Sequence, residues 1–334
     1  MTSVERTLAA LRGERVDRVP NMHLIKQFCT RQLDIRFTDY NRDYRVLVDA
    51  QLRMHDRWGF DCFNTTGYPY REAGDCGLPL EWRDEAVPHA LDVPVKDRKD
   101  IEALTWPDPW DGPLMRDRLN AIRLFKRERP EVTVLGWVEG CFAQAATFRG
   151  LNQLMMDLVL EPALVRELMD FCLPMETAFA RAQVEAGADI IGIGDSAASL
   201  VRRDHYAEFI LPYEHKLIEA IHGMGAPTKL HICGDITRLL PDMATLPVRM
   251  VDVDWMVDLK EARAVLGPEV CLWGNFDPVR VLLQGAPEQV REACCRCIRE
   301  SGPRYVLSAG CEVPPDTPAE NFAAACEVYE QASV

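Results

Sequence analysis

Short apolar runs rich in β-branched residues alternate along the chain with longer amphipathic stretches of helical period. Eight runs are predicted as strands, at residues 19–25, 61–66, 132–140, 188–195, 228–233, 250–255, 270–276 and 305–311. Helices are predicted between them, for example at residues 43–58, 162–186, 203–224, 259–266 and 287–300. This alternation indicates a parallel sheet, and eight units predict an α/β fold of the (β/α)8 TIM barrel type.

The N-terminus carries a helix signal of its own. The spacing of Thr2 and Glu5 forms a capping box, which predicts a helix through Leu11 that Gly13 ends. We expect this helix to cover the bottom of the barrel, because the first strand follows it after a short connection.

The long connection between the second and third strands is predicted as an insertion covering about residues 67–114. Prolines interrupt an alternating, hairpin-like pattern at residues 77–96, and a helix is predicted at 115–127. We expect residues 1–334 to form a single domain. The insertion would lie at the top of the barrel, where it can form part of a pocket wall or a lid.

Charge and composition narrow the class of partner. The formal net charge is −14, which argues against nucleic acid or an anionic membrane, because both require a basic surface. The N-terminus has no apolar signal core and no run approaches a membrane span, so a cytoplasmic location is expected. The 12 cysteines lie within predicted strands and helices, which favours free thiols; Cys294, Cys295 and Cys297 are interpreted as core.

Candidate metal ligands occur at two strand ends. His231 and Cys233 end the fifth predicted strand two residues apart, so both side chains point to the same face. Cys311 ends the eighth strand, which reaches the same mouth of a closed barrel. One His and two Cys form a set that leaves a fourth zinc position open. Ordinary core packing and a four-ligand structural zinc are the alternatives, although the three candidate ligands contain no Cys-x-x-Cys pair of the kind that a structural zinc uses.

Acidic residues end other predicted strands. Asp254, on the strand next to His231, is a candidate fourth, displaceable zinc ligand or a hydrogen-bond partner of the site, and a contact to a neighbouring loop is the alternative. Asp195 and Glu139 end the fourth and third strands. For both, catalysis or substrate contact competes with simple capping of a helix.

Four further polar residues are candidates for binding a cofactor at the mouth: Asn64, Tyr68, Glu72 and Asn275. The first three follow the second strand, and the last ends the seventh. Turn formation is the alternative explanation for each of them.

The sequence resembles a known family in several runs spread over nearly the whole chain. These are RGERVDRVP at residues 12–20, LHICGD at 230–235, VDW at 253–255 with Asp258 and Leu259, and WGNFDP at 273–278. They are similar to the uroporphyrinogen decarboxylase superfamily, and within it to the zinc-dependent methylcobamide:coenzyme M methyltransferases and related corrinoid methyltransferases.

The methyltransferase resemblance implies a barrel enzyme that moves a methyl group between a corrinoid and a zinc-activated thiol or a methylated substrate. Its zinc ligands would be His231, Cys233 and Cys311. The implied cofactors are Zn²⁺ and a corrinoid, either as free methylcobamide or on a partner protein. The other partner would be a small-molecule methyl donor or acceptor, whose identity stays open.

Two rival functions remain. A uroporphyrinogen decarboxylase-like enzyme would act without metal on a porphyrinogen, with acids such as Asp195 neutralising a protonated pyrrole. Residues 21–29, NMHLIKQFC, lack the arginine-rich motif of that branch. The second rival is a non-catalytic barrel that only docks a corrinoid protein, which four protein ligands on the zinc would support.

Overall fold

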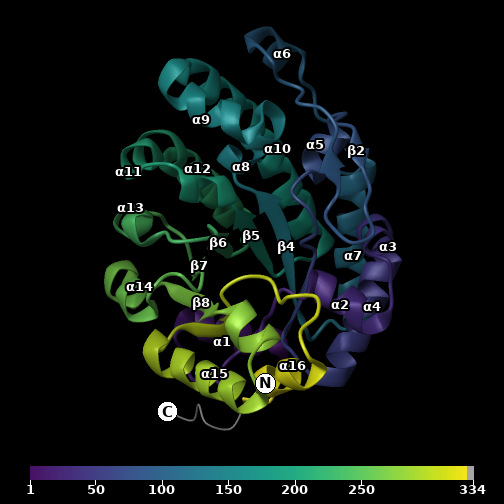
Figure 1. Cartoon of the computed structure of the whole chain (residues 1–334), viewed down its shortest axis with the longest axis vertical. Helices are drawn as coiled ribbons and strands as arrows, with labels where there is room; N and C mark the ends of the chain where they lie inside the picture. The colour runs from purple at the N-terminus through teal and green to yellow at the C-terminus, as the bar shows by residue number, and fades with distance from the viewer. Residues whose placement is uncertain (329–334) are drawn as a thin grey trace.

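The computed structural model describes residues 1–328, in which a parallel sheet is surrounded by helices (Figure 1). The strands of this sheet are β1 (Cys62–Asn64), β4 (Thr133–Glu139), β5 (Ile190–Gly194), β6 (Thr228–His231), β7 (Met250–Asp252), β8 (Cys271–Phe276) and β9 (Tyr305–Ala309). Neighbours in this order pair in parallel and form a curled, seven-stranded sheet. The predicted α/β class is confirmed.

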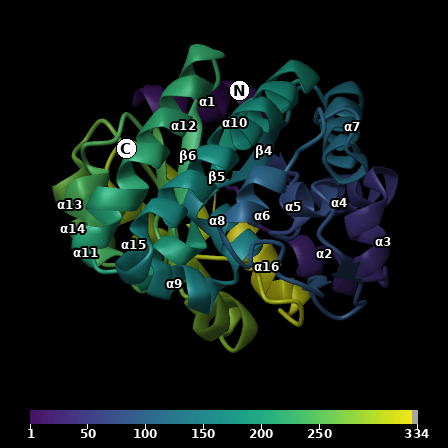
Figure 2. The ribbon, with the colours of Figure 1, turned by 90° about the horizontal axis from the view of Figure 1, so that it is seen from above.

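The helices follow the strands along the chain and lie mainly outside the sheet. They are α1 (Ser3–Arg12), α2 (Lys26–Leu33), α3 (Phe37–Arg42), α4 (Tyr44–Trp58), α5 (Arg71–Asp75), α6 (Arg98–Ala103), α7 (Pro113–Glu128), α8 (Cys141–Arg149), α9 (Leu151–Leu160), α10 (Pro162–Ala186), α11 (Arg203–His205), α12 (Leu211–Gly223), α13 (Leu240–Met243), α14 (Leu259–Leu266), α15 (Pro287–Ser301) and α16 (Ala319–Cys326). Single turns of 3-10 or π helix are η1 (Ser196–Leu200), η2 (Tyr206–Ile210), η3 (Thr237–Leu239) and η4 (Pro278–Leu283). Seen from above, α7, α10 and α12 flank strands β4 to β6 (Figure 2).

The predicted first strand at residues 19–25 is wrong in its extent. Only Asn21 forms a bridge, with Leu307 of β9. Leu307 N–H donates to Pro20 O at 2.8 Å, Met22 N–H donates to Leu307 O at 2.9 Å, and Asp61 N–H donates to Asn21 O at 2.7 Å. This short stretch therefore connects the β9 edge with the chain that enters β1. Pro20 has no N–H to donate, which limits how far the pairing can extend.

The predicted helix at residues 203–224 is interrupted. It is divided into α11, the π turn η2 and α12. Pro212 lies in the first turn of α12 and cannot donate to the carbonyl of Glu208, so the helical pattern changes at this point.

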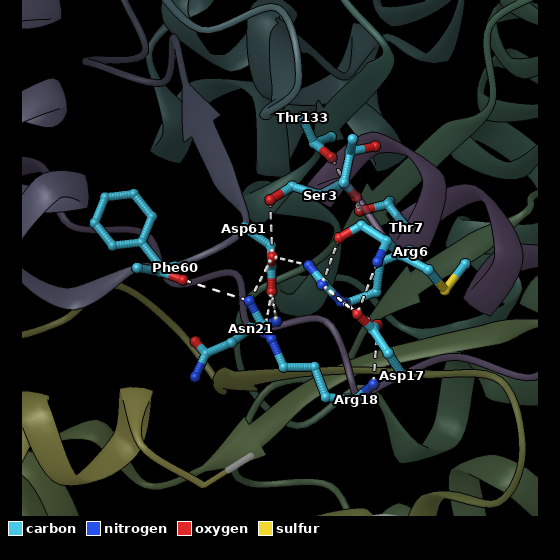
Figure 3. Close-up of polar contacts among 12 residues, drawn as sticks. Ser3, Arg6, Thr7, Asp17, Arg18, Asn21, Phe60, Asp61 and Thr133 are labelled. Carbon is cyan, nitrogen blue, oxygen red and sulfur yellow. Dashed lines mark hydrogen bonds and ion pairs between the residues drawn. The ribbon is translucent and has the colours of Figure 1, made fainter.

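A network of charged side chains fixes the N-terminal ends of the strands (Figure 3). The capping box on Thr2 begins α1 as predicted, and this helix carries Arg6. The fully buried carboxylate of Asp61, just before β1, accepts hydrogen bonds from Arg6, Arg18 and the N–H of Asn21. Arg6 also binds Asp17 at 2.7 Å. The network joins α1 to the end of the sheet opposite to the carboxyl ends of the strands.

The connection between β1 and β4 contains a small hairpin. β2 (Leu80–Glu81) pairs antiparallel with β3 (His89–Ala90), within the segment interpreted as an insertion. Helices α5 and α6 and the start of α7 also belong to this connection. Within residues 1–328, no helix is long and apolar enough to cross a membrane.

Candidate metal centre

A small pocket opens at the carboxyl ends of the strands. Its cavity has a volume of about 160 Å³. The lining residues come from the segment at residues 24–26, from the carboxyl ends of β4, β5 and β6, and from the chain that follows β1, β5, β6 and β9: Leu24, Lys26, Thr66, Gly67, Tyr68, Pro69, Trp137, Glu139, Gly194, Ser196, His231, Cys233, Cys311 and Glu312. The three candidate metal ligands, Glu139 and Tyr68 all line this pocket.

The structure brings His231, Cys233 and Cys311 together. His231 is the last residue of β6, and Cys233 lies two residues after it. The side chain of Ile232, between them in the chain, is buried in the larger of the two hydrophobic clusters, which also contains side chains of the surrounding helices (the outer core). Cys311 follows β9. One ligand atom from each residue lies within 4.8 Å of the others, and His231 Nε2 is 3.0 Å from Cys233 Sγ.

This donor set fits a zinc ion. Nitrogen and sulfur ligands of a tetrahedral zinc are roughly 3.6 to 3.8 Å apart, and the three candidate atoms lie within 4.8 Å of one another. Imidazole and thiolate are the ligand types that zinc prefers. Three protein ligands also leave one position for water or substrate.

The two cysteines differ in acidity. A hydrogen bond from Cys233 lowers the pKa of Cys311 to about 4, with a further contribution from His231 and against the effect of burial. The same contact raises the pKa of Cys233, as does burial. The contact between the two sulfurs therefore favours ionisation of one of them, and a thiolate is the form of cysteine that binds a metal cation.

A charged pair lies directly behind His231. Asp252 of β7 is aligned with His231 across the sheet, and its Oδ2 is 3.2 Å from His231 Nδ1. The same Oδ2 is 2.6 Å from Nζ of Lys229, which precedes His231 by two positions on β6. All three side chains are buried.

Asp254 lies beside the candidate ligands but is held by the backbone. Its Oδ2 accepts from Gly234 N–H at 2.8 Å and its Oδ1 from Met256 N–H at 3.1 Å. Burial raises the pKa of Asp254. The charge of Cys311 also raises this pKa, whereas the charge of His231 lowers it. Asp254 therefore fixes the loop after β6, in agreement with the alternative interpretation, while its carboxylate stays close to the ligands.

Glu139 is the acid that faces the pocket. It ends β4 and accepts a hydrogen bond from Trp137 Nε1 at 3.1 Å. Burial, and after it the neighbouring Glu72 carboxyl, raise the pKa of Glu139 to about 8. Behind it, Glu72 and Glu176 are fully buried near Arg71, and burial raises the pKa of both carboxyls.

Three other candidates lie outside the pocket lining. Asp195 is fully buried and accepts from Ala143 N–H at 2.8 Å, so it caps the start of α8. Asn64 accepts from Thr66 Oγ1 at 2.6 Å. Asn275 donates to the carbonyls of Asp254 and Val257 at 3.2 and 2.7 Å, and so supports the loop after β7. Each of the three is therefore engaged in hydrogen bonds within the fold.

The sequence interpretation missed Lys26, Glu312, Lys229 and Asp252. Lys26 and Glu312 form an ion pair of 2.9 Å in the pocket wall. Glu312 could have been found from its place next to Cys311. Lys229 and Asp252 could have been found from strand alternation, which directs Lys229 to the same face as His231.

The protein is thus a parallel α/β protein that carries a His-Cys-Cys cluster at the carboxyl ends of its strands. The chain belongs to the uroporphyrinogen decarboxylase (URO-D) family, which matches residues 2–332. The resemblance inferred from the sequence runs is thereby confirmed.

Curated relatives carry two different activities. The chain is 29% identical over 328 residues to "Methylcobamide:CoM methyltransferase MtbA" of Methanosarcina mazei, covering 96% of this chain and 95% of that protein. It is 30% identical over 340 residues to "Uroporphyrinogen decarboxylase" of Anaeromyxobacter dehalogenans, covering 96% of each chain. Membership of the family alone therefore does not distinguish a methyltransferase from a decarboxylase, and the residues of the site have to be considered.

The fold also has a solved counterpart. A "methyltransferase from Methanosarcina mazei" superimposes with a TM-score of 0.89 at 24% identity, and the match covers 98% of each chain. At this identity the match supports the fold of the described residues.

Proposed function

We propose that this protein is a zinc-dependent methyltransferase that moves a methyl group between a corrinoid and a small thiol or methylated substrate. The convergence of His231, Cys233 and Cys311 in one pocket carries the proposal. Methylcobamide:CoM methyltransferases among the relatives support it. The corrinoid would be free methylcobamide or the cofactor of a partner protein.

We further propose that the chain forms one (β/α)8 barrel domain. The segment around Asn21 would take the place of the first strand, because it pairs with Leu307 on one side and with Asp61 on the other. A closed arrangement explains why Cys311, after β9, meets His231 at the end of β6.

His231, Cys233 and Cys311 would hold the ion, and the fourth position would be open to water or substrate, because both oxygens of the nearby Asp254 carboxylate accept backbone N–H groups. When bound, zinc would lower the pKa of a substrate thiol and polarise a methylated oxygen or sulfur. In the thiol direction, a sulfur–carbon bond forms, the cobalt–carbon bond breaks with both electrons left on cobalt, and the thiol proton is released.

Glu139 is the group we assign to that proton. Its carboxyl faces the pocket and titrates near pH 8. A group that titrates close to the working pH can accept a proton in one direction and return it in the other. Glu139 therefore suits transfer to a thiol as well as removal of methyl from a substrate. Tyr68 lines the same pocket and would contact the substrate.

A decarboxylase would need a different pocket. A porphyrinogen with many carboxylates requires several cationic side chains, but the lining contains one lysine, Lys26, which is paired with Glu312. Glu139 adds a further acid to the wall.

A purely structural zinc, as in a non-catalytic docking barrel, would use four protein ligands. The described residues bring three His, Cys, Asp or Glu side chains together at this point.

The test is loss of the methyl–cobalt absorbance of methylcobalamin in the presence of zinc-loaded protein and a panel of small thiols. We expect transfer to at least one thiol, loss of transfer in Cys311→Ala, and normal transfer in Cys295→Ala, a partly buried cysteine on α15. The reverse assay uses cobalt(I) cobalamin with methylated thiols and methoxylated aromatics. Absence of transfer in both directions, combined with release of CO₂ from a porphyrinogen, would establish the decarboxylase instead.

A further inference from the structure

A lysine lies inside the apolar interior of the sheet, where a charge needs a specific reason. Lys229 is fully buried, and its Nζ lies 4.1 Å from the ring centre of Trp273 and 5.3 Å from that of Trp137. Both tryptophans belong to the cluster of apolar side chains enclosed by the strands. An isolated ammonium group in such surroundings would be strongly unfavourable without a partner.

The partner of Lys229 is the carboxylate of Asp252, and one oxygen of this carboxylate contacts both Lys229 and His231. Asp252 Oδ2 is 2.6 Å from Lys229 Nζ and 3.2 Å from His231 Nδ1. The backbone carbonyl of Asp252 lies 3.3 Å from the same Nδ1. The carboxylate and the backbone carbonyl of Asp252 are thus both on the Nδ1 side of His231, while Nε2 faces Cys233 at 3.0 Å.

This arrangement has a direct consequence for a metal ligand. An imidazole that donates its Nδ1 hydrogen to a carboxylate presents the Nε2 lone pair in a fixed direction. The register of the sheet maintains the geometry, since His231 and Asp252 are aligned on neighbouring strands and Lys229 shares the inward face of β6.

We propose that Lys229 and Asp252 are positioning residues for the metal ligand His231: Asp252 orients the imidazole with Nε2 toward the ion, and Lys229 holds the carboxylate in place. The inference rests on the proposed metal site, and it assigns a role to two residues inside the sheet that do not line the pocket. Their role is distinct from that of an ordinary buried ion pair, which would stabilise the fold alone.

The test separates metal binding from stability. Lys229→Met or Asp252→Asn alone leaves one buried charge unpaired and endangers folding. The double variant K229M/D252N removes both charges, and Met retains an unbranched side chain between the two tryptophans. The matched control is R149M/D157N, which removes another buried ion pair, of 2.6 Å, between the last residue of α8 and α9.

Zinc affinity is measured by competition with a chromophoric chelator, and Co²⁺ loading is followed by its visible absorption. We expect K229M/D252N to be folded by circular dichroism, to bind zinc about 10- to 100-fold more weakly and to show altered Co²⁺ bands, while R149M/D157N binds as wild type does. A folded K229M/D252N with wild-type affinity and spectrum would overturn the inference. If wild type itself binds no zinc, the proposed function fails first.

A second measurement needs no variant and applies if K229M/D252N does not fold. In wild-type protein with ¹⁵N-labelled histidine and bound ¹¹³Cd²⁺, we expect one histidine whose Nε2 is coupled to cadmium and whose Nδ1 carries the hydrogen. Coupling of cadmium to Nδ1 of that histidine would contradict the proposed role of Asp252, whatever the variants do.

Discussion

Nε2 of His231 lies 3.0 Å from Sγ of Cys233, with Ile232 between them directed into the outer core. The chain therefore presents two candidate metal-binding atoms to the pocket within three residues, and Cys311 completes the candidate set from the far end of the sequence. The site depends on both the local geometry of β6 and the curling of the sheet that brings the end of β9 close to it.

The carboxyl of Glu139 is expected to make stability depend on pH. Its pKa rises from 4.5 to about 8 on folding, so between these values the folded state retains a proton that the unfolded state has lost. The free energy of unfolding should therefore decrease as pH increases through this window. Glu139→Gln removes a contribution of up to about 1.4 kcal/mol per pH unit.

Urea unfolding at several pH values between 5 and 8 measures this slope. Glu292→Gln, on the exposed side of α15, is the matched control and should keep the wild-type slope. An unchanged slope in Glu139→Gln would mean that the proton is held elsewhere, on Glu72, Glu176 or another buried acid.

The ion pair between Lys26 and Glu312 is expected to set the charge preference for substrates. Glu312→Gln leaves Lys26 without its counter-charge at the pocket wall. The KM for a thiol that carries a second, anionic group should decrease about fivefold, the effect of roughly 1 kcal/mol for a partly solvated pair. Steady-state assays with an anionic and a neutral thiol of similar size make the comparison. Equal changes for both thiols would refute it.

Asp61 is expected to stabilise the fold without affecting the metal site. Its buried carboxylate binds Arg6, Arg18 and the N–H of Asn21 at the opposite end of the strands (Figure 3). Asp61→Asn should lower the free energy of unfolding by about 3 to 5 kcal/mol, whereas Asp17→Asn, at a more exposed position, should cost about 1 kcal/mol or less. Zinc content of the folded fraction should be normal in both, and its loss in Asp61→Asn would disprove the separation.

Much of the fold could be predicted because strands and helices alternate with clear periodicity. The strand at residues 19–25 was overestimated, since an apolar run beside Pro20 resembles a strand although only a short stretch finds partners. The break at η2 follows from Pro212, whose effect on a long amphipathic pattern is local.

The candidate ligands could be predicted because strand ends meet in this class of fold. Asp195, Asn64 and Asn275 also lie at the ends of strands but are held by hydrogen bonds to other parts of the fold or to a nearby residue, and the residue type alone does not reveal these partners. The buried group of Glu72, Glu176 and Arg71 could not be predicted, because α5 and α10 are far apart in sequence and only the folded chain places them behind Glu139.

The zinc content of anaerobically purified protein tests the central claim most directly, measured together with Cys233→Ala, Cys311→Ala and the control Cys295→Ala. We predict about one zinc ion per chain in wild type and in Cys295→Ala, and loss of the ion in the other two variants. Protein that binds no zinc even when it is supplied, or that retains the ion in both Cys233→Ala and Cys311→Ala, would contradict the proposed metal centre and the methyl transfer that depends on it.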